Sequence, residues 1–389
     1  MTLLNSQYPS LVYDIGSSTI QFGHSGDAQP LCSVPSYASH NALDNDVFRF
    51  GHEWHEGAMP NFEEKKMISD DGSLLDKDLL ETFFDWTYQK CFFIDSADFP
   101  ILVTQPSHLY AQPDSFSNWR KSICEITFEF AQHPMVCLEH DSVLASFAHS
   151  AHTGVVVDFG WSCLRTVPIL NGKPLLKSMG IGNIGGSFLC QNLGNILANN
   201  GIEIQTLLDN SGVAPTESKI KCCQRYVLQD VIRSCLTFPP LSNVSYCIQG
   251  KQEINVTPGI QNLFSQIWTI QGSKNNNNKI PEYLSISINN NKTPADVRRQ
   301  LWANIITSGG LSNLNGFKTE LEKFARSRAP ENYRATAKVL PPMHRITSGQ
   351  NTVWTGGSIL ASLDTFPEFC ITLAEWKEEG ESVLQRKCI

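Results

Sequence analysis

One short motif occurs twice in this chain and limits what it can fold into. The sequence Leu11-Val-Tyr-Asp14-Ile-Gly16 recurs as Val155-Val-Val-Asp158-Phe-Gly160, and a second stretch rich in strand-forming residues follows each copy. An internal repeat of this kind indicates two related structural units. After the second copy, Asn171-Gly172 separates two strand-like runs and is a strong signal for a two-residue hairpin turn. The repeat therefore predicts two related lobes, each containing a strand that ends in Asp-x-Gly.

The first half of the chain alternates between strand-like and helix-like segments, which predicts an α/β fold. The segment from Leu74 to Tyr88 carries an apolar stripe at helical spacing, and Ser73-x-x-Asp76 could cap its start. The runs of Asn at 274–279 and 289–291 are too hydrophilic to join a core, so we expect exposed loops there.

Composition narrows the classes of partner. The chain has 389 residues, 30 Lys and Arg, and a net charge of −8, which gives little electrostatic basis for binding nucleic acid directly. It contains no run of about 18 apolar residues, and its first eight residues have neither a basic start nor an apolar stretch, so we expect no secretory leader, no membrane span and no disulfides among its 12 Cys. Protein partners or a small ligand are the expected binding classes.

The Asp-x-Gly motif has a possible chemical use. Asp at a strand end can hold a hydrated divalent cation, while the following Gly lets backbone N–H groups approach a phosphate. Either copy alone is most simply an Asx-type turn, and two copies leave open both a shared phosphate site and turns that serve only the architecture of the lobes. Gly309-Gly310 could serve the same ligand or form only a structural turn.

Other candidate metal sites are weak. His52-Glu-Trp-His55 lacks the i, i+4 pairing of a zinc-binding helix, and Cys222-Cys223 with Cys235 lacks CxxC spacing. We expect no metal site from either group.

Three stretches carry a resemblance to a known family. Residues 14–30 resemble the first phosphate loop of actin, and residues 157–169 resemble the second. Residues 354–366, with the ending 385–388, are similar to the actin C-terminal signature. The resemblance to the actin and actin-related superfamily spans nearly the whole chain in order.

The resemblance implies two ribonuclease-H-like lobes around a nucleotide cleft. The smaller lobe would comprise residues 1–150 with 351–389, and the larger lobe residues 151–350. The cleft residues that it implies are Asp14, Gly16, Ser17, Ser18, Asp158, Gly160, Gly309 and Gly310. Asp14 and Asp158 would hold a metal ion only if nucleotide is retained.

The departures from actin argue against catalysis. Gln21 stands where actin has a phosphate-binding Lys, which removes a compact positive charge. Asp141 aligns with the Gln that positions the attacking water, Arg165 with a His of the second loop, and Trp161 replaces a small acidic residue there. We therefore expect the ATPase activity to be lost.

The adenosine side is also altered. The residues aligned with those that meet the base and ribose are Ile232 and Arg233, and a basic residue over adenine maps near Gln350. Losing several such partners costs about 1.5–3 kcal/mol each. We expect no cofactor, or ATP with magnesium if any is bound.

Of the two regions through which actin binds other proteins, one is shortened in this chain and the other is retained. Only Tyr37 to Phe50 separates Pro35-Ser36 from Gly51, so the projecting loop that grips the next subunit in a filament is shortened. A homopolymer is therefore not expected. An apolar groove that binds partner helices would be lined by Phe147, Leu360, Leu363, Thr365 and Phe369. Alternatively, Leu360 and Leu363 are core residues of an amphipathic helix.

Together these features predict a non-polymerising structural subunit that binds a long helix of a larger complex, with actin or another actin-related protein as a possible second partner. Family analogy favours a nuclear chromatin-remodelling or histone acetyltransferase assembly. The alternatives are a capping subunit of cytoplasmic dynactin and an ATP-hydrolysing, filament-forming protein.

Overall fold

The computed structural model describes residues 9–41, 44–51, 62–202, 204, 216–248, 252–268, 279–343 and 348–387. Its strands are β1 (Leu11–Ile15), β2 (Thr19–His24), β3 (Cys32–Pro35), β4 (Tyr37–Asn41), β5 (Asp44–Arg49), β6 (Phe62–Lys66), β7 (Ile101–Gln105), β8 (Met135–His140), β9 (Gly154–Phe159), β10 (Leu164–Leu170), β11 (Lys173–Pro174), β12 (Gly180–Gly182), β13 (Ser245–Ile248), β14 (Gln252–Asn255), β15 (Ile305–Ser308) and β16 (Ile371–Thr372).

The α-helices are α1 (Lys77–Trp86), α2 (Pro113–Cys124), α3 (Asp141–Phe147), α4 (Gly186–Asn199), α5 (Glu217–Cys235), α6 (Thr257–Ile267), α7 (Ile280–Asn289), α8 (Arg298–Ala303), α9 (Phe317–Arg328), α10 (Glu331–Arg334), α11 (Thr352–Ala361), α12 (Leu373–Glu379) and α13 (Ser382–Lys387). Two π-helical turns, η1 (Thr87–Phe92) and η4 (Glu125–Phe130), extend α1 and α2. The mixed architecture confirms the α/β class.

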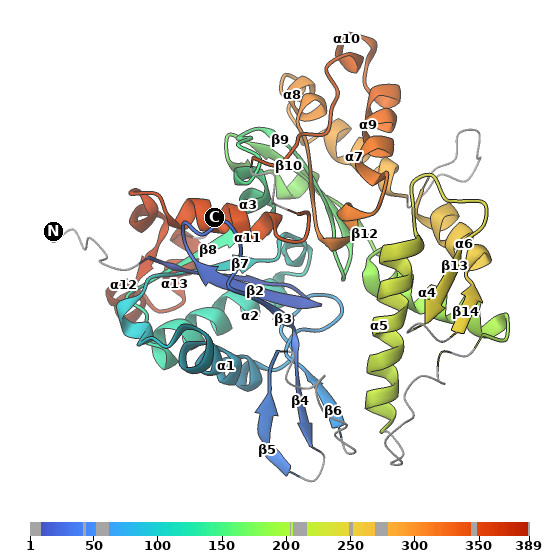
Figure 1. The fold of residues 1–389 in the computed structure, drawn as a ribbon. Coiled ribbons are helices and arrows are strands. Elements are labelled where there is room, and N and C mark those ends of the chain that lie inside the picture. Colours follow the sequence, from blue (N-terminus) through green and yellow to red (C-terminus); the bar gives the residue numbers. More distant parts are fainter. Residues whose placement is uncertain are drawn as a thin grey trace.

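Two sheets organise the molecule (Figure 1). The first has the order β16-β8-β7-β1-β2-β3, in which β1, β7 and β8 run parallel. The second has the order β11-β10-β9-β15, with β12 paired to β10. We call the first sheet, its helices and the β5-β4-β6 sheet the first lobe, and the second sheet with α4–α9 the second lobe. The predicted boundaries at residues 150 and 350 stay a prediction.

The apolar core follows this division. One cluster packs α1, α2 and the inner face of the first sheet, and another packs α4–α9 against β9 and β15. A third cluster joins the lobes: Val12 of β1 and Val156 of β9 belong to it together with residues of α3 and α11. The two repeated strands therefore share one packed interface.

Local predictions fare unequally. Asn171 and Gly172 both have positive φ, 49° and 77°, and connect β10 to β11 as the hairpin signal predicted. The cap of α1 was predicted wrongly, because the side chain of Asp76 accepts from the Leu79 N–H while the Ser73 hydroxyl is held by Asp71.

The polar runs fit the loop prediction only in part. Asn289 and Asn291 are exposed, but Asn289 is the last residue of α7 and not part of a loop. Most of the run at 274–279 and the motif His52–His55 lie outside the described residues. Within the described ranges, no helix has the length and apolar character needed to cross a bilayer.

Candidate functional site

The repeated Asp-x-Gly turns meet at a cavity of about 160 Å³ between the two lobes. All eight residues that the sequence predicted for the cleft line it: Asp14, Gly16, Ser17, Ser18, Asp158, Gly160, Gly309 and Gly310. Asp14 comes from β1 and Asp158 from β9, at equivalent places in the two sheets. Their role as ligand-binding residues stays a prediction.

Two glycines in the lining are required by close backbone contacts. Gly16 donates its N–H to the carbonyl of Thr19, and a Cβ at Gly16 would lie 2.8 Å from that oxygen. Gly309 has φ +85°, and a Cβ there would lie 2.4 Å from the carbonyl oxygen of Phe159. Only Gly adopts the positive φ of Gly309 without strain, and neither position has room for a side chain, so these turns shape the cavity whether or not they contact a phosphate.

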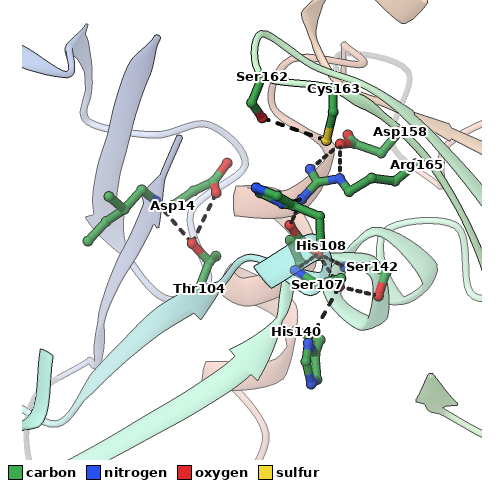
Figure 2. A network of polar contacts seen from close by, with 12 residues as sticks. Asp14, Thr104, Ser107, His108, His140, Ser142, Asp158, Ser162, Cys163 and Arg165 are labelled. Carbon is green, nitrogen blue, oxygen red and sulfur yellow. Dashed lines mark hydrogen bonds and ion pairs between the residues drawn. The ribbon is translucent and has the colours of Figure 1, made fainter. Parts of the chain in front are cut away.

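Arg165 dominates the polar contacts at the floor of the cavity (Figure 2). Its Nε donates to Asp158 Oδ2 at 2.9 Å, and its Nη2 is also paired with that carboxylate. Its Nη1 donates to Asp141 Oδ2 at 2.7 Å and to His108 Nδ1 at 2.8 Å. Because Asp158 belongs to β9 while Asp141 and His108 belong to the first lobe, one guanidinium ties the two lobes together.

Within this network, the opposite charges of Arg165 and its carboxylate partners stabilise one another. Burial alone would raise the pKa of Asp141, but Arg165 and the Ser107 hydroxyl outweigh it and hold the pKa below its ordinary value. Burial would lower the pKa of Arg165, but Asp141 and Asp158 raise it. Burial and the neighbouring Arg165 lower the pKa of His108 to about 4, so this ring is neutral and accepts at Nδ1 while Nε2–H donates to the Asp71 carbonyl.

Asp14 lies on the opposite side of the cavity (Figure 2), and no ion pair of the described residues includes it. Its Oδ1 accepts from the Thr104 hydroxyl at 3.2 Å. Burial, followed by the negative charges of Asp141 and Asp158, raises its pKa to about 7. Asp14 is therefore only partly ionised at neutral pH.

The residues present do not fit a hydrated metal ion with a nucleotide. Asp158 Oδ2 and Asp141 Oδ2 already bind the guanidinium, and Asp141 Oδ1 accepts from the N–H groups of Ser107 and Ser142. A divalent cation would lie beside a buried positive charge that cannot be deprotonated. The cavity is also smaller than the roughly 300–1,000 Å³ usual for cofactor sites. Among the described residues, no group of three or more His, Cys, Asp or Glu side chains is arranged to hold a metal.

Trp161 borders the cavity and contacts the first lobe. Its ring packs on the backbone of Gly186 at the start of α4, where a Cβ would lie 2.6 Å from the ring. Its Nε1–H donates to Asp70 Oδ1 of the first lobe at 3.1 Å. The side chain that replaces a small acidic residue of actin thus forms a second contact between the lobes.

The remaining predicted departures are divided between the cavity and its surroundings. Ile232, Arg233 and Gln350 line the cavity, as their alignment to the adenosine side predicted. Gln21 does not: it is 2% exposed, and its amide donates to Asn351 Oδ1 at 2.9 Å. Thus the first hairpin presents no cation to the cavity at this position.

The side chains predicted to bind a partner helix differ in exposure. Leu363 and Phe369 are 42% and 49% exposed, Thr365 is exposed, and Phe147 at the end of α3 is half-buried. Leu360 is 1% exposed and belongs to the cluster that joins the lobes, so for this residue the alternative as a core side chain holds. Leu363, Thr365 and Phe369 are exposed, whereas Phe147 packs in part against the same cluster, and a role of these side chains in partner binding stays a prediction.

Sequence reasoning missed His108, Thr104 and Asp70, which all touch the site. His108 and Thr104 follow or end β7, and a polar residue at the carboxyl end of a parallel strand was the available signal. Asp70 lies in an irregular loop before α1 and carried no signal.

Comparison with known proteins agrees with the resemblance. The sequence profile of the family described as Actin matches residues 5–237 and 246–389. Actin-related protein 4 of Arabidopsis thaliana is 29% identical over 355 residues, which cover 82% of this chain and 78% of that protein. Actin-related protein 4 of Oryza sativa subsp. japonica is 25% identical over an alignment 453 positions long, which covers 97% of this chain and 98% of that protein. Actin-like protein 7A of Mus musculus is 26% identical over 317 residues, covering 82% and 68%.

Proposed function

Because the chain belongs to the actin family and has the actin-like fold, we propose that it is a non-polymerising, non-catalytic actin-related subunit that binds a helix of a larger assembly. By analogy with nuclear family members, that assembly is a chromatin-remodelling or histone acetyltransferase complex, and the chain acts in the nucleus. Its partners are protein subunits, including a second actin-like chain.

The observation that carries this proposal is the ion-pair network of Arg165. The guanidinium binds Asp158 and Asp141, the residues at the metal and water positions of the family. Gln21 leaves the first phosphate loop without its cation. A family member that has lost its catalytic site can still bind other proteins through the surfaces of the fold, and we propose that this chain does so.

The exposed apolar side chains support a helix-binding role. Leu363 and Phe369 lie on neighbouring turns after α11, and the Phe366 N–H donates to the Leu363 carbonyl to hold this segment. A partner helix is recognised through apolar anchors spaced three or four residues apart. Removing apolar surface from water favours binding by about 25 cal/mol per Å², and what exceeds the entropy cost of association appears as affinity.

A matched pair of variants tests the partner surface. Leu363→Asp would bury an unpaired carboxylate under the partner helix, and we expect at least about tenfold less of the complex to co-purify with the tagged protein, judged by quantitative mass spectrometry. Leu241→Asp is the control, because Leu241 is 55% exposed in the second lobe, away from the proposed surface. Equal recovery with both variants would contradict the assignment of this surface.

Two further outcomes separate the alternatives. We expect a remodeller motor subunit and an actin-like chain among the recovered proteins, whereas dynactin subunits would favour the capping role. We also expect no ATP turnover above background and no pelleting of purified protein with salt and magnesium; turnover at the rate of actin, or pelleting, would favour the filament-forming alternative.

A further inference from the structure

The lobes are joined by contacts that the actin resemblance does not imply. Glu64 of β6 and Arg225 of α5 form a bidentate ion pair, with Nη1–Oε1 at 2.9 Å and Nη2–Oε2 at 2.7 Å. The Glu64 side chain is 9% exposed and that of Arg225 is 20% exposed. Paired donors and acceptors in this planar geometry are among the stronger interactions between side chains. In Figure 1, β6 and the long helix α5 lie side by side at the edge of the two lobes.

Further groups surround this ion pair. The guanidinium of Arg225 lies over the Tyr37 ring, 4.8 Å from its centroid. The Tyr37 hydroxyl is hydrogen-bonded to the Tyr226 hydroxyl and lies 3.8 Å from Cys222 Sγ. Tyr37 belongs to β4, whereas Cys222 and Tyr226 belong to α5. We call these five side chains, Tyr37, Glu64, Cys222, Arg225 and Tyr226, the mouth contact.

The Glu64 backbone also takes part. Its N–H donates to Ser218 Oγ at 2.9 Å, in the first turn of α5. Both the backbone and the side chain of one β6 residue are thus bound by α5. On the side of the mouth contact that faces the cavity, the space lined by Tyr37, Trp161 and Arg225 measures only about 10 Å³.

The floor of the cavity is bridged by the second arginine. Arg165 binds Asp158 of the second lobe together with Asp141 and His108 of the first. Strand pairing fixes the position of Arg165. In the β9–β10 pair, Asp158 lies opposite Arg165, and in the β1–β2 pair, Asp14 lies opposite Gln21. The two repeats therefore differ at one equivalent position, where the first carries an amide and the second a guanidinium.

We propose that the chain holds its two lobes closed with its own cations, Arg165 at the floor and Arg225 at the mouth, in place of a metal-bound nucleotide. This inference rests on the proposed loss of catalysis and deepens it: a subunit that serves as a docking block needs a fixed arrangement of lobes, and these contacts supply it without a ligand. Closure is then insensitive to ATP and to magnesium.

Hydrogen–deuterium exchange of the purified full-length chain tests the mouth contact. We expect the amides of β6 and α5 to exchange at the same rate in EDTA and in excess magnesium ATP. In Arg225→Gln they should exchange about tenfold faster in both solutions. The exchanged pair Glu64→Arg with Arg225→Glu should restore the slow rate. Lys221→Gln is the control, because it removes an exposed ion pair with Glu217 on the same helix.

Two results would overturn the proposal. One is slow exchange of β6 in the wild type only when magnesium ATP is present, a measurement that does not depend on any variant folding. The other is an Arg225→Gln protein that exchanges as slowly as the wild type.

Magnesium alone tests the floor contact. Wild-type Tm should not change when magnesium chloride replaces sodium chloride at equal ionic strength. Arg165→Gln frees the carboxylates of Asp141 and Asp158, and its Tm should rise with magnesium. A saturable rise in the wild type would overturn the role given to Arg165.

The partner surface can fail separately. Leu363→Asp should leave β6 and α5 exchange unchanged, because Leu363 lies outside both contacts. If the lobes are not held closed but the partner still binds, this inference fails and the proposed function stands. If the lobes are held closed but the partner does not bind, the proposed function fails and this inference stands.

Discussion

At the scale of single residues, Asp14 shows what the substituted cavity costs the fold. Burial and the repulsion of Asp141 and Asp158 raise its pKa from 3.8 to about 7. A carboxyl whose pKa is raised in the folded state destabilises that state as pH rises above the unfolded pKa, up to the folded pKa. The loss amounts to about 1.4 kcal/mol for each pH unit in that interval.

Asp14→Asn should therefore stabilise the protein. The amide keeps the size of the side chain and has no charge, so the gain in the free energy of unfolding should be larger at pH 8 than at pH 5, by roughly 2.6 kcal/mol. Urea unfolding at both pH values measures it. Asp158→Asn is the contrasting variant, because it leaves buried Arg165 with one fewer carboxylate and should destabilise by about 3 kcal/mol. An equal effect of Asp14→Asn at both pH values would contradict the raised pKa.

At the scale of elements, the turn after β15 is set by one of two adjacent glycines. Gly309 has φ +85° and no room for a Cβ, whereas nothing lies within 4 Å of a Cβ at Gly310. We expect Gly309→Ala to destabilise by about 2 kcal/mol or more, and Gly310→Ala to change stability by less than about 0.5 kcal/mol. Thermal unfolding of the two variants measures the difference, and similar Tm values would argue against the turn geometry.

Sequence patterns predicted elements that depend on near neighbours. The repeated strands that carry Asp14 and Asp158 and the turn at Asn171-Gly172 follow from local preferences, and so they were found. The cap of α1 was assigned to the wrong residue, because Asp76 takes the capping position and the Ser73 hydroxyl binds Asp71 instead.

Long-range pairing left no local trace. Glu64 and Arg225 are 161 residues apart in the chain, and each alone is an ordinary charged residue on a strand or a helix. In the cavity, the alignment identified Arg165 as a substitution. Its partners became evident only when β7, β9 and α3 were placed together.

At the scale of the whole molecule, buried titratable groups set the pH dependence. Burial lowers the pKa of His108, His133 and His140 to about 4, and raises that of Asp14 and Glu139 to about 7. Between pH 4 and 6.5 the three His bind protons in the unfolded chain but not in the folded chain, whereas the two carboxyls bind protons only in the folded chain. The unfolded chain therefore binds more protons in total, by about one.

Stability should thus rise with pH up to about 6.5 by roughly 1.4 kcal/mol per unit, and then fall as the two buried carboxyls ionise near pH 7. Urea unfolding across pH 4.5–8.5 should give a maximum between about pH 6 and 7. A stability that keeps increasing beyond pH 8 would contradict the assignment of these five groups.

The first sheet takes strands from both ends of the chain. β1 begins at Leu11, while β16 adds to β8 at Ile371, and the indole N–H of Trp354 donates to the Val12 carbonyl across 342 residues of sequence. During synthesis on the ribosome, the second lobe has all its strands before this sheet has its last one. Until the C-terminal residues are made, β8 lacks its neighbour β16 and the face of the first sheet that packs on α11 is uncovered. We therefore expect a newly made chain to be most exposed to aggregation at the end that was translated first.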